Sequence, residues 1–150
     1  MDNSENIEDK IDWKKIDQLH NATINFSKNS LEIKKLLFVV IGISTPLIIN
    51  LCNNQLDVAL FISLYIIIFS FWIFDSYTYY YQKKLRFQMD YYFEQILTRN
   101  TNAQQKDSKK WKVSKMIIIT LFNLSHFCFY GILIIVTIIL NLLFCYNIIG

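Results

Sequence analysis

Three long apolar stretches alternate with polar segments along this chain of 150 residues. They are Leu36–Cys52, Val58–Phe74 and Met116–Ile149, and none of them contains Asp, Glu, Lys or Arg. A transmembrane helix needs roughly 17–25 apolar residues at a rise of 1.5 Å per residue, so each stretch is long enough to cross a bilayer. The pattern predicts an all-α, polytopic membrane protein with three transmembrane helices.

The third stretch allows two interpretations. Met116–Ile149 is too long for one upright crossing and too short for two crossings with a turn between them. Gly131 is the one glycine inside it, and an isolated glycine seldom forces a hairpin. We therefore expect one long helix whose first part lies at the membrane surface or in the cytoplasm. A re-entrant hairpin is the alternative.

The polar segments next to the first two stretches also show helical periodicity. Apolar residues recur every three or four positions before the first stretch and after the second, which predicts amphipathic helical extensions. The segment TRNTNAQQKDSKK has no such period and is typical of a linker. The expected segments are an amphipathic helix (1–35), a first span (36–52), a loop (53–57), a second span (58–74), its helical continuation (75–97), a linker (98–110), the start of the third helix (111–126), a third span (127–146) and a tail (147–150).

The distribution of charge predicts the orientation in the membrane. The net charge is +3, but the segment 75–115 alone carries nine basic residues against four acidic ones. Lys34 and Lys35 directly precede the first span. Basic residues close to a span favour the cytoplasmic side. We therefore expect a multi-pass protein of the cell inner membrane, with a cytoplasmic N-terminus, helical cytoplasmic extensions and an external C-terminus.

Residues that could carry enzymatic chemistry are scarce. The three cysteines lack the spacing of metal ligands, and the three glycines form no phosphate-binding loop. No Ser, His and Asp or Cys and His set lies in one segment where a nucleophile could be argued. We expect no catalytic residues, no metal, no cofactor and no direct contact with nucleic acid. The expected partners are membrane lipid, further copies of the chain and a soluble cytoplasmic protein.

A stripe of polar residues follows one face of the third stretch. At 100° per residue its members fall within about 60° of one another. Polar groups in hydrocarbon face protein or water, so the stripe predicts either helix packing or, in an oligomer, the wall of a water-filled path. We call the following residues the polar stripe: Asn123, His126, Tyr130, Thr137 and Asn141.

A second group of candidate residues follows the second span. Here aromatic side chains suited to the membrane interface precede cationic ones. We expect Asp75 to accept hydrogen bonds from a neighbouring helix. The candidate junction residues are Trp72, Asp75, Tyr77, Arg86 and Asp90.

These junction residues resemble a tract in small, mostly uncharacterised bacterial membrane proteins. In that family the second span ends in Trp-x-x-Asp-x-Tyr, followed by Glu, Arg and an acidic residue on a cytoplasmic helix. The five residues match in register, but Gln82 stands where the family has Glu. Some of these proteins look like membrane components of antiphage defence systems. The structural alternative is that the tract is an interface anchor and a clasp that packs the helices together.

Together these observations suggest two functions. The first is an oligomeric inner-membrane effector that perturbs membrane integrity, in the manner of a defence protein or toxin. The alternative is a non-conducting accessory or sensor subunit whose basic cytoplasmic helix recruits a soluble partner or anionic lipid. A carrier with intramembrane charges is disfavoured, because no charged residue lies within any apolar stretch.

Overall fold

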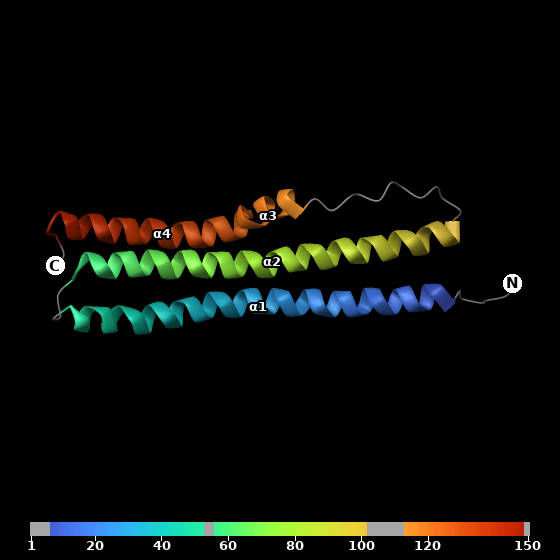
Figure 1. Cartoon of the computed structure of the whole chain (residues 1–150), viewed down its shortest axis with the longest axis horizontal. Helices are drawn as coiled ribbons and strands as arrows, with labels where there is room; N and C mark the ends of the chain where they lie inside the picture. Colours follow the sequence, from blue (N-terminus) through green and yellow to red (C-terminus); the bar gives the residue numbers. More distant parts are fainter. Residues whose placement is uncertain (1–6, 53–55, 102–112, 149–150) are drawn as a thin grey trace.

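The computed structural model describes residues 7–52, 56–101 and 113–148, and this part of the chain is all-helical, as predicted. Its helices are α1 (Ile7–Leu51), α2 (Val58–Thr101), α3 (Val113–Leu121) and α4 (Leu124–Cys145). They lie side by side along the long axis, with α2 between α1 on one side and α3 and α4 on the other (Figure 1).

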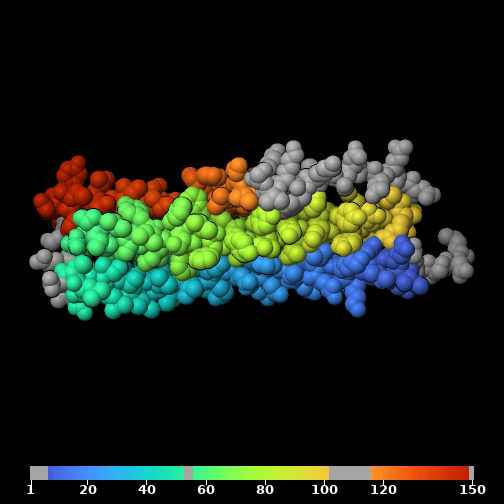
Figure 2. Space-filling view, in the orientation of Figure 1, coloured from blue at the N-terminus to red at the C-terminus, as the bar shows by residue number. Residues whose placement is uncertain are grey.

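The long helices α1 and α2 form an antiparallel hairpin and stay in contact along their length (Figure 2). Both change from apolar to polar near their middle, and the turn between them joins their apolar ends. The two apolar segments therefore lie side by side, and α4 packs against the apolar segment of α2 (Figure 1). We call residues 36–51, 58–74 and 124–145 the apolar half, and residues 7–35 and 75–101 the polar half.

The core lies where the three long helices meet. Leu37 of α1, Ile68 of α2 and Tyr130 of α4 are fully or almost fully buried and contact one another. Close packing of these side chains adds many van der Waals contacts, which help to hold the three helices together. Half-buried apolar neighbours complete the cluster: Ile41, Ile67, Phe71, Trp72, Phe129, Leu133 and Ile134.

The apolar half exposes large hydrophobic side chains on all three helices. A soluble monomer rarely exposes contiguous apolar patches beyond a few hundred Å², so this belt marks a surface that meets lipid or protein. It includes the following residues: Phe38, Val39, Ile43, Leu47, Ile62, Ile66, Phe69, Ile73, Ile132, Ile135, Val136 and Ile139.

Two of the described helices, α2 and α4, are long and apolar enough to cross a membrane. The predicted first span in α1 is not among them. Its helix ends at Leu51, and Lys34 and Lys35 precede Leu36, so its uncharged part is short for a crossing. The structure therefore gives two candidate spans where the sequence predicts three.

The third apolar stretch differs from the single continuous helix predicted for it. The helix is interrupted: α3 ends at Leu121 and α4 begins at Leu124. We call this interruption the break. Asn123 is the N-cap residue of α4, with extended backbone angles (φ −63°, ψ 131°). No hairpin forms within the described part of this stretch, because α4 runs unbroken past Gly131 to Cys145.

The other helix ends also depart from the predicted boundaries. The continuation of the second span reaches Thr101 rather than residue 97, so the predicted linker begins later than 98. At the other end of the molecule, α4 closes in a Schellman motif, in which Ile148 N donates to Leu143 O and Asn147 N donates to Phe144 O. Asn147 has the positive φ of 54° that this motif needs. Parts of the predicted loop, linker, third-helix start and tail (53–55, 102–112 and 149–150) lie outside the described residues.

Candidate functional site

Asp75 lies at the centre of the molecule, where the apolar half of α2 gives way to the polar half. Its side chain is completely buried between α1 and α4. A buried carboxylate is costly unless it is paired and hydrogen-bonded. The side chains that pair with Asp75 come from α1 and α4. We call Ser30, Lys34, Asp75, His126 and Tyr130 the Asp75 cluster.

Helix α1 supplies the cation and one hydroxyl of this cluster. Lys34 Nζ lies 2.7 Å from Asp75 Oδ2, and its side chain is only 19% exposed. Ser30 Oγ donates a hydrogen bond to Asp75 Oδ1, and Lys34 Nζ donates to Ser30 Oγ at 3.0 Å. Ser30 and Lys34 are one turn apart on α1, so both reach the same carboxylate. The positive charge of Lys34 offsets the negative charge of Asp75, so the buried site is close to electrically neutral.

Helix α4 supplies an aromatic hydroxyl and an imidazole to the same carboxylate. Tyr130 Oη lies 3.2 Å from Asp75 Oδ2 and 3.3 Å from the carbonyl oxygen of Phe71, so one proton is shared between two acceptors. His126 Nδ1 lies 3.1 Å from Asp75 Oδ2, but the ring is poorly aligned for a hydrogen bond. Asp75 thus accepts hydrogen bonds from both neighbouring helices, as expected from its position.

Trp72 holds the break between α3 and α4 close to this cluster. Its indole Nε1 donates a hydrogen bond to the carbonyl oxygen of Leu121 at 3.2 Å. A carbonyl at a helix end has lost its partner in the helix, and the indole supplies one. The indole also stacks on Tyr130 and contacts Phe122 edge-on. One side chain of α2 therefore positions both the break and the start of α4.

The polar stripe is divided by the structure. His126, Tyr130 and Thr137 are buried against the rest of the chain, and the first two join the Asp75 cluster. Thr137 donates to the carbonyl of Leu133 in its own helix. Asn123 and Asn141 are half-buried and contact neither Asp75 nor Lys34. Within one chain, most of the stripe faces α2 rather than an aqueous path.

The candidate junction residues are divided in the same way. Trp72 and Asp75 lie at the site. Tyr77 is 59% exposed and hydrogen-bonds Tyr81 on its own helix. Arg86 and Asp90 are exposed and lie three and four turns beyond Asp75 on α2. The five residues therefore do not form one clasp.

Sequence reasoning missed Lys34 and Ser30 as members of the site. Lys34 was recognised only as a basic residue that flanks the first span. A signal was present, because Lys34 and Asp75 both stand where an apolar stretch meets a polar one. In an antiparallel hairpin two such positions lie at the same height, and opposite charges there can pair.

A second ionic network joins the far ends of the hairpin. Arg99 of α2 contacts three acidic residues near the start of α1: Glu8, Asp9 and Asp12. Asp12 also accepts from Lys15 at 3.0 Å. Burial opposes ionisation of Asp12, but the hydrogen bonds from Arg99 and Lys15 prevail and hold its pKa below the ordinary value. The hydrogen bond to Asp12 also raises the pKa of Arg99 and of Lys15.

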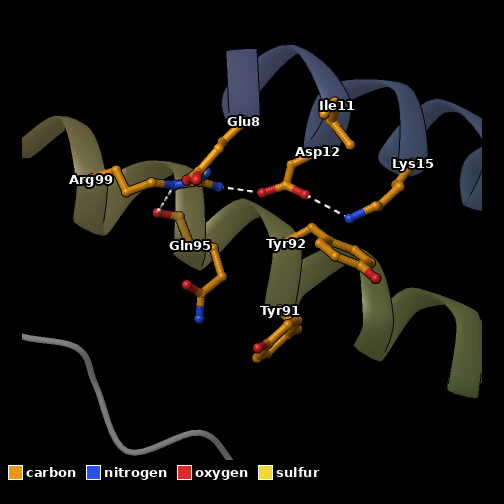
Figure 3. Close-up of a pocket in the computed structure, with 8 residues that line it drawn as sticks. All are labelled: Glu8, Ile11, Asp12, Lys15, Tyr91, Tyr92, Gln95 and Arg99. Atoms are coloured by element: carbon orange, nitrogen blue, oxygen red, sulfur yellow. Dashed lines mark hydrogen bonds and ion pairs between the residues drawn. The ribbon is translucent and has the colours of Figure 1, made fainter. Parts of the chain in front are cut away.

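A wide, open pocket of about 390 Å³ lies beside this network (Figure 3). Its acidic and basic side chains already pair with one another, and Lys15 lies over the ring of Tyr92. Among the described residues that line it, none is a His, Cys or Ser. It is lined by Glu8, Ile11, Asp12, Lys15, Tyr91, Tyr92, Gln95 and Arg99.

The residues that the structure describes contain no group of three His, Cys, Asp or Glu side chains that could hold a metal ion. No family model, curated protein or solved structure matches the chain. The Asp75 cluster is therefore the strongest candidate site. It can couple the helices, because one buried carboxylate is shared by α1 and α4 and loses partners if either helix moves.

Proposed function

We propose that the chain is a multi-pass protein of the bacterial inner membrane, with α1 crossing together with α2 and α4. The exposed apolar belt supports this arrangement, because it includes Phe38, Ile43 and Leu47 of α1. The apolar end of α1 also lies beside the apolar end of α2 (Figure 1). In this arrangement the polar half extends into the cytoplasm and the C-terminus is external, as the distribution of basic residues favours.

Within that membrane, we propose an oligomeric effector that rests in a closed form and perturbs membrane integrity when it is triggered. The observation that carries this proposal is the buried Asp75 cluster. A buried carboxylate is costly unless its partners stay in place, and the partners of Asp75 come from two different helices, so the cluster loses stability when α4 moves. In the resting form Asp75 holds α4 against the hairpin and keeps His126 and Tyr130 away from water and lipid.

The trigger then acts by separating α4 from α2. Separation breaks the contacts of Asp75 with Tyr130 and His126, and it turns the polar stripe toward its surroundings. In lipid such polar side chains need new partners, which other copies of the chain can offer. The expected product is an assembly in which polar faces of several α4 helices enclose water.

The test is membrane depolarisation in cells that express variants of the full chain. Tyr130→Phe removes one hydroxyl and keeps the ring, so it weakens the closed form without creating a cavity. A hydrogen bond to a charged group contributes about 1.5–3 kcal/mol, so the open population is expected to rise by about tenfold or more. Tyr146→Phe is the matched control, because Tyr146 is 74% exposed at the end of α4.

Depolarisation that increases with Tyr130→Phe and not with Tyr146→Phe supports a closed effector. Adding Asn141→Leu should then reduce it, because Asn141 belongs to the stripe but not to the Asp75 cluster. Depolarisation by neither Tyr variant, with each protein present in the membrane at the parent level, contradicts the proposal.

The burial of the stripe also favours a second candidate function. His126, Tyr130 and Thr137 pack inside a single chain, which suits a non-conducting accessory or sensor subunit that recruits a soluble partner or anionic lipid. For such a subunit, Tyr130→Phe lowers the amount of folded protein and causes no depolarisation. The two candidate functions thus differ in whether Tyr130→Phe depolarises the membrane.

A further inference from the structure

A strip of four exposed or half-exposed side chains follows one face of α2 across the boundary between the two halves. Its members are Phe74, Tyr77, Tyr81 and Lys84, at spacings of three, four and three residues. Residues with these spacings lie above one another on a helix. Phe74 and Tyr77 are about 60% exposed, and Lys84 is exposed. Phe74, Tyr77 and Lys84 therefore stay accessible in the described part of the chain, whereas Tyr81 is half-buried against α1.

The phenol rings of this strip are held in place. Tyr77 Oη donates to Tyr81 Oη at 3.1 Å, and the two rings meet at 4.8 Å in a T-shaped contact. Phe26 of α1 stacks on Tyr81 with ring centroids 5.6 Å apart and planes at 12°. Lys84 Nζ lies over the Tyr81 ring, 5.8 Å from its centroid. The strip is thus fixed by its own contacts and by α1.

The side chains of the strip become more polar from Phe74 to Lys84, in the same order as the groups of a phospholipid from its acyl chains to its headgroup. An apolar ring comes first, two phenols with polar tips follow, and an ammonium group comes last. From Phe74 to Lys84 the helix rises by about 15 Å, enough to pass from the acyl region through the headgroups. Aromatic rings and lysine are the side chains that favour this zone, and the ammonium group complements an anionic headgroup.

We propose that this strip binds the headgroup of an anionic phospholipid, with the acyl chains along Phe74, the phenols at the glycerol level and Lys84 at the phosphate. The inference rests on the proposed membrane location of the chain. It does not require the proposed effector action, because the strip lies on the face of α2 that the Asp75 cluster leaves open. The bound lipid fixes the height of the junction relative to the bilayer.

The test uses the full chain reconstituted in vesicles of phosphatidylcholine with spin-labelled phosphatidylglycerol or spin-labelled phosphatidylcholine. The fraction of immobilised label gives the preference for the anionic lipid. We expect a preference in the parent, and Lys84→Gln should lower the association constant about fivefold. Tyr77→Phe with Tyr81→Phe should lower it by a smaller factor, because the rings remain. Arg86→Gln is the matched control: it removes an exposed cation of α2 that lies off the strip.

An equal association of both lipids with the parent overturns the inference, and so does an equal loss from Arg86→Gln and Lys84→Gln. The second outcome would indicate a diffuse attraction by all nearby cations. Failure of the parent to insert into the vesicles would overturn the membrane location itself. Insertion without lipid preference would overturn this inference alone.

Discussion

The carboxylate of Asp75 on α2 contacts side chains of both α1 and α4, so this residue links the three helices. Lys34 neutralises it from α1, and Tyr130 and His126 approach it from α4. Replacing a buried ion pair by apolar residues is often neutral, whereas removing one partner leaves an uncompensated charge. We therefore expect that replacing Asp75 alone is destabilising and that replacing Lys34 as well offsets most of the loss.

The first prediction concerns this pair. Asp75→Leu leaves the half-buried Lys34 without its counterion and should lower the free energy of unfolding by about 3 kcal/mol, the lower end of the range for buried pairs. Lys34→Met combined with Asp75→Leu should recover most of the loss. Unfolding in detergent, followed by circular dichroism, measures both. Asp90→Leu is the control, since Asp90 is exposed and should change stability by less than about 0.5 kcal/mol. A double variant no more stable than Asp75→Leu would contradict the pairing.

The second prediction concerns the distal network. The folded state holds the pKa of Asp12 below its ordinary value of about 3.9, so Asp12 stabilises the fold above that pH. This contribution is lost as the pH falls through the folded pKa. Amide hydrogen exchange in residues 7–16, corrected for the intrinsic rate, should therefore accelerate in acid below about pH 4. In Asp12→Asn it should be faster at neutral pH and depend less on pH. Identical pH profiles for parent and variant would show that Asp12 does not anchor this end.

At the scale of elements, the break between α3 and α4 is the feature that most shapes the molecule. It lets α3 lie at an angle to α4 while both helices contact α2 (Figure 1). Trp72 satisfies the carbonyl of Leu121 at the break, and Asn123 has the extended backbone of the N-cap position of α4, without a capping hydrogen bond from its side chain. The break is thus held by a tertiary contact as well as by local sequence.

A third prediction follows for this contact. Trp72→Phe removes the indole donor and should speed amide exchange in residues 116–121 about fivefold, as a net loss of about 1 kcal/mol implies. Trp13→Phe is the control, because Trp13 packs on Phe93 in the polar half. Unchanged exchange in Trp72→Phe would mean that α3 is held by other contacts.

The sequence predicts the positions of the helices well, but it does not predict which side chains pair between them. The apolar runs and their periodic extensions indicate α1, α2 and α4, since hydrophobic spacing is a local property. The break at Asn123 escapes prediction, because the sequence around it contains no glycine or proline. The Lys34–Asp75 and Arg99–Asp12 pairs also escape, because the register of the hairpin brings together residues that are far apart in sequence. Asp75 alone stands out locally, as an acidic residue directly after an apolar run.

At the scale of the whole molecule, the sequences of α1 and α2 divide the hairpin into an apolar half and a polar half, which lie end to end because the two helices run side by side (Figure 1). This division suits a chain embedded by one half and projecting by the other. The proposed orientation makes a fourth prediction. A reporter fused after Gly150 should be external, and one inserted at Asn100 should be cytoplasmic. A cytoplasmic C-terminus would contradict the three-span arrangement and leave α2 and α4 as the two crossings.

The most direct test of the closed-effector account is ion flux from vesicles that contain only the purified chain. The parent should release ions slowly, because Asp75 keeps α4 against the hairpin. Tyr130→Phe should raise the rate by about tenfold, and Tyr146→Phe should leave it unchanged. Asn141→Leu in the Tyr130→Phe background should lower the rate again. Equal slow release from the parent and from Tyr130→Phe, with both proteins folded and inserted, would contradict the account and favour a non-conducting subunit.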